Sequence, residues 1–347
     1  MTIRVALIGC GLMGQAHLPG YLAAESRARL VMCCDRDERR AGELAARLAG
    51  PVTVATDWQQ VVASDAVDAV DICAPPVLHA PIVLAAAKAG KHILLEKPMA
   101  MNLAEGRTMV EAADAAHIVF MVAQNQRYLP EHRRIKGLLD QGAIGKVLAA
   151  RIDGNQFLKN IYPPGHWLFS QALTGGGVIR TTAIHKLDLL RYFLGEPRRV
   201  TALHRRSGLN PGMDNEDIAV FAVEFENGAL AEAFFTFAAY QNPIRTASGE
   251  LVILYGTAGM ISNVGSWQMY STNAPGYQQT MTSLGLSEAD YKGSFCNEVI
   301  HFLDCIETGR EPLSSGRDNL RTIATIDALY HAAETGQTTT VELISFD

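Results

Sequence analysis

The sequence predicts an α/β protein in which an N-terminal, doubly wound parallel sheet precedes a C-terminal α+β domain with a large, mainly antiparallel, open sheet. Three observations lead to this prediction. Short apolar runs alternate with amphipathic segments in the first third of the chain, and a glycine-rich turn follows the first apolar run. After about Gln124, longer runs of loosely alternating hydrophobicity take over. We therefore divide the chain into domains 1–123 and 124–347.

Composition favours a folded two-domain protein. The chain has 347 residues, of which 48% are hydrophobic and 19% charged, and this balance excludes a disordered chain. A net charge of −6 argues against a nucleic-acid partner. The six cysteines form no CxxC pair, which indicates free thiols in a reducing compartment. We find neither a signal peptide nor an apolar run of membrane-spanning length, so we expect a soluble, cytoplasmic protein without a membrane partner.

The elements of the first domain follow from apolar runs and their boundaries. Nearly continuous apolar runs are typical of strands buried on both faces, and they predict strands at residues 3–9, 29–34, 69–73, 92–95 and 118–123. The segments between them predict helices at residues 12–24, 38–48, 81–89 and 103–116. Pro19 lies inside the first helix, so we expect that helix to be kinked or short.

The second domain is richer in strands. We expect strands at residues 147–156, 200–206, 218–226, 229–240, 250–255 and 259–270, and helices at 295–308 and 318–333. Asn227-Gly228 separates two of these strands and is a strong hairpin signal. Three phenylalanines in one strand, Phe234, Phe235 and Phe237, predict a sheet face that is buried between subunits of a homodimer or homotetramer.

Residues 9–14 read GCGLMG, a GxGxxG motif between the first strand and the first helix. Gly9 allows a tight turn, Gly11 lets a pyrophosphate approach the backbone, and Gly14 lets the helix pack on the strand. Asp35 ends the second strand at the position where an acid accepts hydrogen bonds from an adenosine ribose. This context predicts a Rossmann domain that binds NAD. The neighbouring Arg36 leaves NADP possible as a less favoured cofactor, because it could pair with a 2′-phosphate.

Residues Glu96-Lys97-Pro98 directly follow the strand at 92–95. In an open parallel sheet, ligands bind outside the carboxyl ends of the strands, so Lys97 is expected over the cofactor crevice. A lysine there can hold or relay the proton of an alcohol that is being oxidised. A surface lysine in a loop is the alternative interpretation.

Three glycines at 175–177 precede a predicted helix that carries His185. Val178, Thr181, His185 and Asp188 fall on one stripe of that helix, which points to a general base in a cleft or to a partly buried structural histidine. Arg180 and Lys186 lie off this stripe, and we expect both to face solvent.

Other candidates are weaker. Tyr162, His166 and Trp167 lie in a Pro/Gly-rich loop that could place aromatic faces against a sugar. Arg127 and Tyr128, near the domain boundary, could contact substrate or join the domains. The ten histidines show no HExxH or HxH spacing, so we expect no metal site.

Together these motifs resemble the Gfo/Idh/MocA family, which includes glucose–fructose oxidoreductase and inositol dehydrogenase. Residues 74–79, 124–128 and 142–146 are also similar to family segments. The resemblance implies reversible hydride transfer between a nicotinamide and a hydroxyl of a sugar or cyclitol, with Lys97 and His185 touching the reacting hydroxyl. It also implies that the peptide before Pro98 is often cis. An aspartate often stands four residues before the histidine in this family, whereas this chain has Thr181, and Asp188 could orient the ring instead.

The motifs and the resemblance together define the predicted site. The predicted catalytic residues are Lys97 and His185. The predicted cofactor-binding residues are Gly9, Gly11, Leu12, Met13, Gly14, Asp35, Arg36, Ala74, Pro75, His79, Glu96, Lys97 and Asn125. The predicted substrate-binding residues are Lys97, Arg127, Tyr162, His166, Trp167, Thr181 and His185.

The predicted function is an NAD(H)-dependent oxidoreductase that interconverts a secondary hydroxyl and a ketone or lactone on a sugar, a sugar derivative or an inositol. Two alternatives stay open at this point. One is a glycoside-cleaving enzyme that oxidises its substrate transiently with tightly held NAD. The other is a non-catalytic regulator that binds NAD and a sugar.

Overall fold

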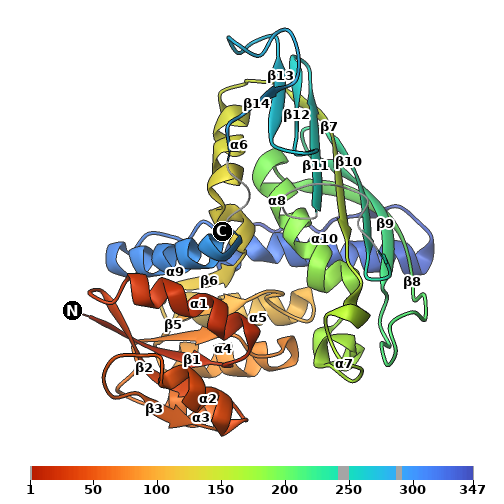
Figure 1. The fold of residues 1–347 in the computed structure, drawn as a ribbon. Coiled ribbons are helices and arrows are strands. Elements are labelled where there is room, and N and C mark those ends of the chain that lie inside the picture. The colour runs from red at the N-terminus through yellow and green to blue at the C-terminus, as the bar shows by residue number, and fades with distance from the viewer. Residues whose placement is uncertain (1, 241–249, 287–290, 347) are drawn as a thin grey trace. The chain divides into compact units, whose positions relative to one another are not determined.

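The computed structural model describes residues 2–240, 250–286 and 291–346 (Figure 1). The chain forms two compact units. Unit 1 contains Met1–Tyr128 and Tyr291–Ile323, and unit 2 contains Leu129–Asp290 and Ala324–Asp347. The sequence division into 1–123 and 124–347 follows the order of the chain. The compact units differ from it because a segment from near the C-terminus belongs to unit 1.

Unit 1 is built on a six-stranded parallel sheet with the strand order β3-β2-β1-β4-β5-β6. Its strands are β1 (Ile3–Ile8), β2 (Ala28–Cys34), β3 (Thr53–Ala55), β4 (Ala69–Ile72), β5 (His92–Glu96) and β6 (Phe120–Ala123). Its main helices are α1 (Leu12–Ala23), α2 (Glu38–Ala45), α3 (Trp58–Val62), α4 (His79–Lys88), α5 (Leu103–Ala115) and α9 (Tyr291–Thr308). The order reverses between β1 and β4, as in a Rossmann fold, so the predicted fold class of this part is confirmed.

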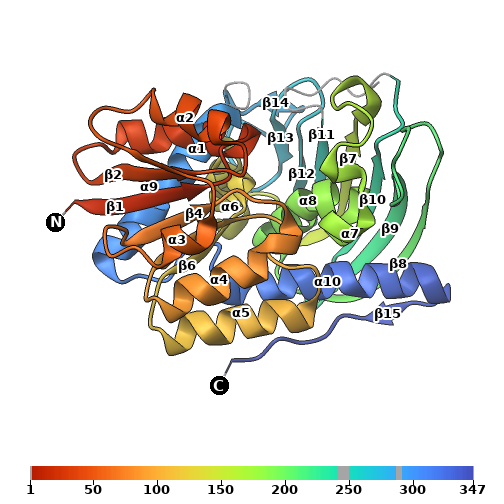
Figure 2. The ribbon, with the colours of Figure 1, turned by 90° about the horizontal axis from the view of Figure 1, so that it is seen from below.

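Helix α9 belongs to unit 1 because it completes the layer over one face of the sheet. It lies beside α1 on that face, while α4 and α5 lie on the other face (Figure 2). Gly20 makes the contact close, since a Cβ built on it would lie 2.6 Å from the Cβ of Val299. Val299, Phe302 and Leu303 join Leu18 in the hydrophobic core of this unit. Burial of this apolar surface gives α9 its place despite its distance along the chain.

Unit 2 contains a nine-stranded sheet with the order β14-β13-β12-β11-β7-β10-β9-β8-β15. Its strands are β7 (Val147–Asn155), β8 (Pro197–Arg205), β9 (Ile218–Phe225), β10 (Leu230–Thr236), β11 (Glu250–Gly256), β12 (Gly259–Ser262), β13 (Gln268–Ser271), β14 (Thr282–Ser283) and β15 (Thr339–Thr340). Only the β7–β10 pair is parallel among these described strands. The expected mainly antiparallel sheet is therefore confirmed.

One face of this sheet is covered and the other is open. Helices α6 (Pro130–Asp140), α7 (Gln171–Thr174) and α8 (Ile184–Leu194) lie on the same side of the strands in both views, and α10 spans Gly316–Thr335 (Figures 1 and 2). On the other side, the side chains of Leu203, Val220 and Phe234 are exposed. Successive residues of a strand point to opposite faces, so Phe235 turns to the covered face. Phe235 and Phe237 are buried within unit 2, which corrects the expectation of three phenylalanines on a shared face.

The predicted hairpin at Asn227-Gly228 joins β9 and β10 as an antiparallel pair, with Gly228 at φ +84°. The predicted strand 259–270 is instead two paired strands, β12 and β13, with a turn at Gly265 (φ +75°). Helix α1 contains Pro19 and nevertheless extends from Leu12 to Ala23, so it is not shortened. The elements β3, α3 and α6 were absent from the prediction; β3 and α3 are only 3 and 5 residues long, too short to show a period.

Candidate active site

The glycine turn after β1 is shaped by close packing at two positions and by open space at the third. Gly9 has φ +99°, and a Cβ on it would lie 2.5 Å from the carbonyl oxygen of Cys73. A Cβ on Gly14 would lie 2.3 Å from the carbonyl oxygen of Gly9. A Cβ on Gly11 would have no atom within 4 Å, so this backbone is accessible to a ligand. Helix α1 begins at Leu12 without a side-chain cap, which leaves its first N–H groups for an anion.

Asp35 lies at the end of β2, next to this turn. Its Oδ2 accepts a hydrogen bond from the backbone N–H of Cys10 at 2.9 Å, and its Oδ1 accepts one from Asp37 at 2.9 Å. Each carboxylate oxygen keeps a further lone pair for a ribose hydroxyl. The turn and the acid thus fit an adenine dinucleotide, whose pyrophosphate the N–H groups of the turn would hold. The other predicted contacts on this edge are partly or fully exposed: Leu12, Met13, Arg36, Ala74 and Pro75.

Lys97 follows the last residue of β5 and lies on the same carboxyl edge of the sheet as the glycine turn. Its side chain is partly buried, and its backbone N–H donates to Oε2 of Glu96 at 3.0 Å. The Lys97–Pro98 peptide is cis, as the resemblance implied. The carboxylate of Glu96 is buried and holds the lysine backbone, and its predicted contact with the cofactor stays a prediction.

His79 connects two backbone turns at this edge of the sheet, and its predicted contact with the cofactor stays a prediction. Its ring is fully buried, with Nδ1 2.9 Å from the carbonyl oxygen of Pro98 and Nε2 2.8 Å from that of Ala74. Burial lowers the pKa of His79, so the neutral ring donates to one carbonyl at a time. The imidazole therefore joins the turn after β4 to the turn after β5 and supports the backbone around Lys97.

Asn125 and Arg127 follow β6 and are bound within unit 1. The side-chain amide of Asn125 donates to Oγ of Ser294 at 2.9 Å. The Arg127 guanidinium lies 2.7 Å from Oδ2 of Asp318 and donates to the carbonyl oxygen of Leu313 at 2.8 Å. Both side chains are buried, so these contacts fix the return of the C-terminal segment, and their predicted ligand contacts stay predictions.

His185 lies in the first turn of α8, directly after a π-helical segment at Ile179–Ala183. The wider turn of a π-helix breaks the regular stripe that the sequence predicted from Val178 to Asp188. Thr181 donates its hydroxyl hydrogen to the carbonyl oxygen of Gly177 at 2.7 Å. His185 is 9% exposed, so its ring lies near the surface of unit 2 with most of its area covered.

Glu216 anchors the start of this segment, a role that the sequence did not reveal. Its carboxylate accepts hydrogen bonds from the N–H groups of Gly177 at 2.8 Å and Ile179 at 3.0 Å. Tyr330 donates its hydroxyl hydrogen to the same carboxylate at 2.8 Å. A Cβ on Gly177 would lie 1.8 Å from the carbonyl oxygen of Glu216, so only glycine fits there. No spacing rule relates Glu216, which precedes β9, to the glycine turn.

The expectation that Arg180 and Lys186 face solvent is wrong. Arg180 is 3% exposed and pairs with Asp327 at 2.6 Å, and Lys186 is 1% exposed and pairs with Glu250 at 2.6 Å. The segment is enclosed on all sides, so even residues off the His185 stripe are buried. Their charges are balanced by these acids rather than by water.

The loop with Tyr162, His166 and Trp167 presents aromatic side chains together. The rings of Tyr162 and His166 stack with centroids 4.2 Å apart, and Trp167 lies 5.5 Å from His166. Trp167 is 39% exposed. This arrangement gives unit 2 an aromatic surface that could contact the C–H face of a sugar.

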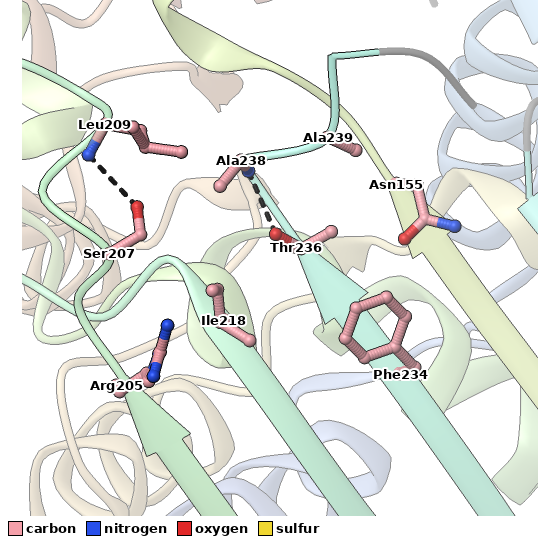
Figure 3. A pocket seen from close by; sticks show the side chains of 9 residues that line it. All are labelled: Asn155, Arg205, Ser207, Leu209, Ile218, Phe234, Thr236, Ala238 and Ala239. Atoms are coloured by element: carbon pink, nitrogen blue, oxygen red, sulfur yellow. Dashed lines mark hydrogen bonds between the residues drawn. The ribbon is translucent and has the colours of Figure 1, made fainter.

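A separate pocket of about 490 Å³ opens on unit 2 and contains none of the predicted site residues. Figure 3 shows its lining along β8, β9 and β10 and near the end of β7, with the hydroxyl of Ser207 accepting from the N–H of Leu209 at 3.1 Å. Its lining residues are Asn155, Arg205, Ser207, Leu209, Ile218, Phe234, Thr236, Ala238 and Ala239. Because Phe234 lines this pocket and is also exposed on the open face of the sheet, the pocket lies beside that face.

Two family models match the chain in succession. One, described as an oxidoreductase family with an NAD-binding Rossmann fold, matches residues 3–124. The other, described as the C-terminal alpha/beta domain of an oxidoreductase family, matches residues 136–343.

Relatives and solved structures agree with these models. Inositol 2-dehydrogenase 2 of Saccharopolyspora erythraea is 30% identical, with 99% of this chain and 96% of the relative covered. D-apiose dehydrogenase of Paraburkholderia graminis is 28% identical, with 99% and 90% covered. The structure of a levoglucosan dehydrogenase in complex with NADH and levoglucosan has a TM-score of 0.88 at 26% identity, with 99% of this chain and 100% of that chain covered.

The glycine turn, the acid after β2 and these similarities define an NAD-binding oxidoreductase. Within that class, the chain belongs to the Gfo/Idh/MocA family. Among the described residues, no helix is both long and apolar enough to span a membrane.

The position of Asp35 predicts its effect on cofactor choice. Replacing Asp35 with Ser removes an anion that accepts from the ribose and repels a 2′-phosphate, so we expect KM for NAD to rise about 10-fold or more and the preference over NADP to narrow. Steady-state kinetics with both cofactors measure this. Asp65→Ser, at an exposed position of the same unit, is the matched control. An unchanged preference in the Asp35 variant would contradict the assignment.

Proposed function

We propose that this protein is an NAD(H)-dependent dehydrogenase that interconverts a secondary hydroxyl and a ketone or lactone on a sugar, a sugar derivative or a cyclitol. One observation carries the proposal: Lys97, the glycine turn and Asp35 lie along the same carboxyl edge of the unit 1 sheet. The names of the relatives, which act on inositol, apiose and levoglucosan, support a polyhydroxylated substrate.

Lys97 and His185 are proposed to act on the substrate hydroxyl. Bound NAD supplies the hydride acceptor, at the nicotinamide ring. The Lys97 ammonium donates a hydrogen bond to the hydroxyl oxygen and stabilises the negative charge that develops there. His185 in its neutral form accepts the hydroxyl proton as the C–H bond breaks and the C=O bond forms. In the reverse direction, His185 returns that proton to the oxygen.

Thr181 distinguishes this chain from family members that carry an aspartate at this position. Its hydroxyl hydrogen is donated to Gly177, so Thr181 adds no negative charge beside His185. A substrate hydroxyl that would hydrogen-bond to such an aspartate therefore has no carboxylate to bind at position 181 of this chain. We therefore propose that Thr181 and the aromatic loop at 162–167 select a less hydroxylated or differently oriented ring.

The function is tested by presenting sugars, sugar acids and inositols with NAD or NADP and following NADH absorbance. We expect net reduction of NAD with at least one member of this panel. Transient oxidation would instead give product release without net NADH and with cofactor bound to the purified protein. Binding of both ligands without any turnover would support a regulator and contradict the proposal.

The catalytic assignment predicts a specific kinetic loss. Lys97→Met and His185→Asn should each lower kcat about 10²–10⁴-fold, because each removes a group that acts in the transition state. NADH affinity, measured by fluorescence titration, should change only a few-fold. Lys88→Met, at an exposed position in α4, is the control. Turnover near the wild-type rate in either variant would remove that residue from the mechanism.

The open face of the unit 2 sheet is proposed to bury against a second copy of the chain. Leu203 in β8 pairs with Val220 in β9, which pairs with Phe234 in β10, so these three side chains form an adjacent row. They are 71%, 50% and 37% exposed. A row of this kind is costly to leave in water and is typical of an interface. Together with six free thiols and a net charge of −6, this supports our proposal of a cytoplasmic homo-oligomer that binds no nucleic acid.

Charge introduced into this row should separate the subunits. Phe234→Glu, alone or with Val220→Glu, is expected to convert the assembly to monomers, because an unpaired carboxylate would be buried in the interface. Light scattering coupled to size-exclusion chromatography measures the mass. Leu22→Glu, at a 45% exposed position of α1, should leave the mass unchanged. A monomeric wild type would contradict the proposed interface.

A further inference from the structure

Unit 1 contains a group of buried ionisable side chains that the proposed mechanism does not use. The group consists of His17 and Tyr21 from α1, Asp71 from β4, Glu96 from β5 and Glu298 from α9, and we call it the buried acid cluster. All of these side chains are buried, and the most exposed of them, Glu96, has 6% of its side-chain surface accessible. It lies at the carboxyl end of β5, directly before Lys97.

One side of the His17 ring is held by Asp71. Nδ1 of His17 lies 2.9 Å from Oδ2 and 3.1 Å from Oδ1 of Asp71. Tyr21 donates its hydroxyl hydrogen to Oδ2 of Asp71 at 2.9 Å, and the thiol of Cys73 donates to Oδ1 at 3.5 Å. His17, Asp71 and Cys73 thus place three possible metal ligands close together. Their side chains, however, already make hydrogen bonds to one another.

The other side of the ring faces two carboxylates. Nε2 of His17 lies 3.3 Å from Oε1 of Glu96 and 3.5 Å from Oε1 of Glu298. Glu96 uses its second oxygen to accept the N–H of Lys97. Glu298 is 0% exposed, and neither of its oxygens has a hydrogen-bond partner among the described residues. The chain of contacts therefore runs from Glu298 through His17 and Glu96 to the backbone of Lys97.

Three carboxylates around one imidazole cannot all be ionised without a large cost. A buried anion without hydrogen bonds loses its hydration, and like charges at this separation repel strongly. Burial, together with the charges of Glu96 and Asp71, raises the pKa of Glu298, although His17 and Lys97 oppose this rise. Burial lowers the pKa of His17, but the carboxylate of Asp71 outweighs this effect, so the pKa of His17 lies well above its usual value.

Other ionisable groups face the cluster without supplying a further charge. Burial and Asp71 raise the pKa of Tyr21, and burial and Asp71 raise that of Cys73 as well. Burial likewise raises the pKa of Tyr128. All three groups are therefore neutral at physiological pH. Lys97 lies outside the cluster, and its positive charge lowers the pKa of Glu298.

We propose that Glu298 is a neutral carboxylic acid and that Glu96, which holds the N–H of Lys97, is a positioning residue for Lys97. In this state the cluster holds one cation, His17, and two anions, Asp71 and Glu96. Nε2 of the imidazolium lies 3.3 Å from Oε1 of Glu96 and attracts this carboxylate, while Oε2 of Glu96 holds the N–H of Lys97. The remaining negative charge of the cluster favours the ammonium form of the lysine. This inference rests on the proposed function for the role of Lys97, but the protonation of Glu298 is independent of that role.

Infrared spectroscopy tests the protonation directly. In deuterium-exchanged wild-type protein at neutral pH, we expect the C=O band of a protonated carboxyl group, and we expect Glu298→Gln to remove it. Glu307→Gln is the matched control, because Glu307 lies on the same helix but at the surface, paired with Arg27. If the band is absent from the wild type, or survives in Glu298→Gln, Glu298 is ionised and the proposal is overturned.

The pH profile tests the effect on Lys97. Glu96→Gln removes an anion and weakens the hold on Lys97, so we expect kcat to fall about 10-fold and the basic limb of the profile to move down by about one pH unit. Glu298→Gln replaces a neutral group with a neutral group and should leave that limb in place. An equal shift in both variants would show that Glu298 carries charge and would overturn the proposal. If Lys97→Met retains turnover, the proposed function fails, whereas the infrared result still decides the state of Glu298.

Discussion

The structure depends on one close approach, the contact between the turn after β1 and the end of β4. Gly9 lies so near the carbonyl of Cys73 that a single Cβ would overlap it, and its φ of +99° favours glycine. This approach brings the N-terminus of α1 to the carboxyl edge of the sheet. Because all parallel strands end at that edge, Asp35 after β2 and Lys97 after β5 lie along it as well. Backbone geometry, rather than any one side chain, gathers the site in unit 1.

Electrostatics then constrains what lies beneath that edge. Polar side chains buried in an apolar core need partners, and in unit 1 the His17 ring and the Asp71 carboxylate are partners of this kind, 2.9 Å apart. Unit 2 uses the same principle differently, since Arg180 and Lys186 are neutralised by single acids from other segments. In both units, buried charges near the predicted catalytic residues are paired with opposite charges from other segments of the chain.

The sequence predicted the local features well and the long-range ones poorly. The glycine turn, the acid at Asp35, the hairpin at Asn227-Gly228 and most helices follow from spacing rules that involve only near neighbours. The role of Glu216 and the packing of α9 onto unit 1 escaped prediction, because the partners of both lie far away in the chain and no spacing rule connects them. The expectation that Arg180 and Lys186 face solvent was wrong for a related reason. Helix periodicity shows which residues share a face of the helix, but it does not show how many of its faces are packed against other segments. The structure places each predicted site residue within its own unit, and the roles of these residues are proposals that variants can test.

The late arrival of α9 has a consequence for biosynthesis. All six strands of the unit 1 sheet leave the ribosome long before Tyr291, so the apolar surface of α1 around Gly20 stays uncovered until α9 is made. His17 meanwhile lacks the carboxyl group that α9 contributes. The nascent N-terminal half is therefore incomplete in both its hydrophobic core and its charge balance until the polypeptide is almost finished. A chain truncated before α9 would therefore lack the helix that completes unit 1, the half of the protein with the cofactor-binding turn.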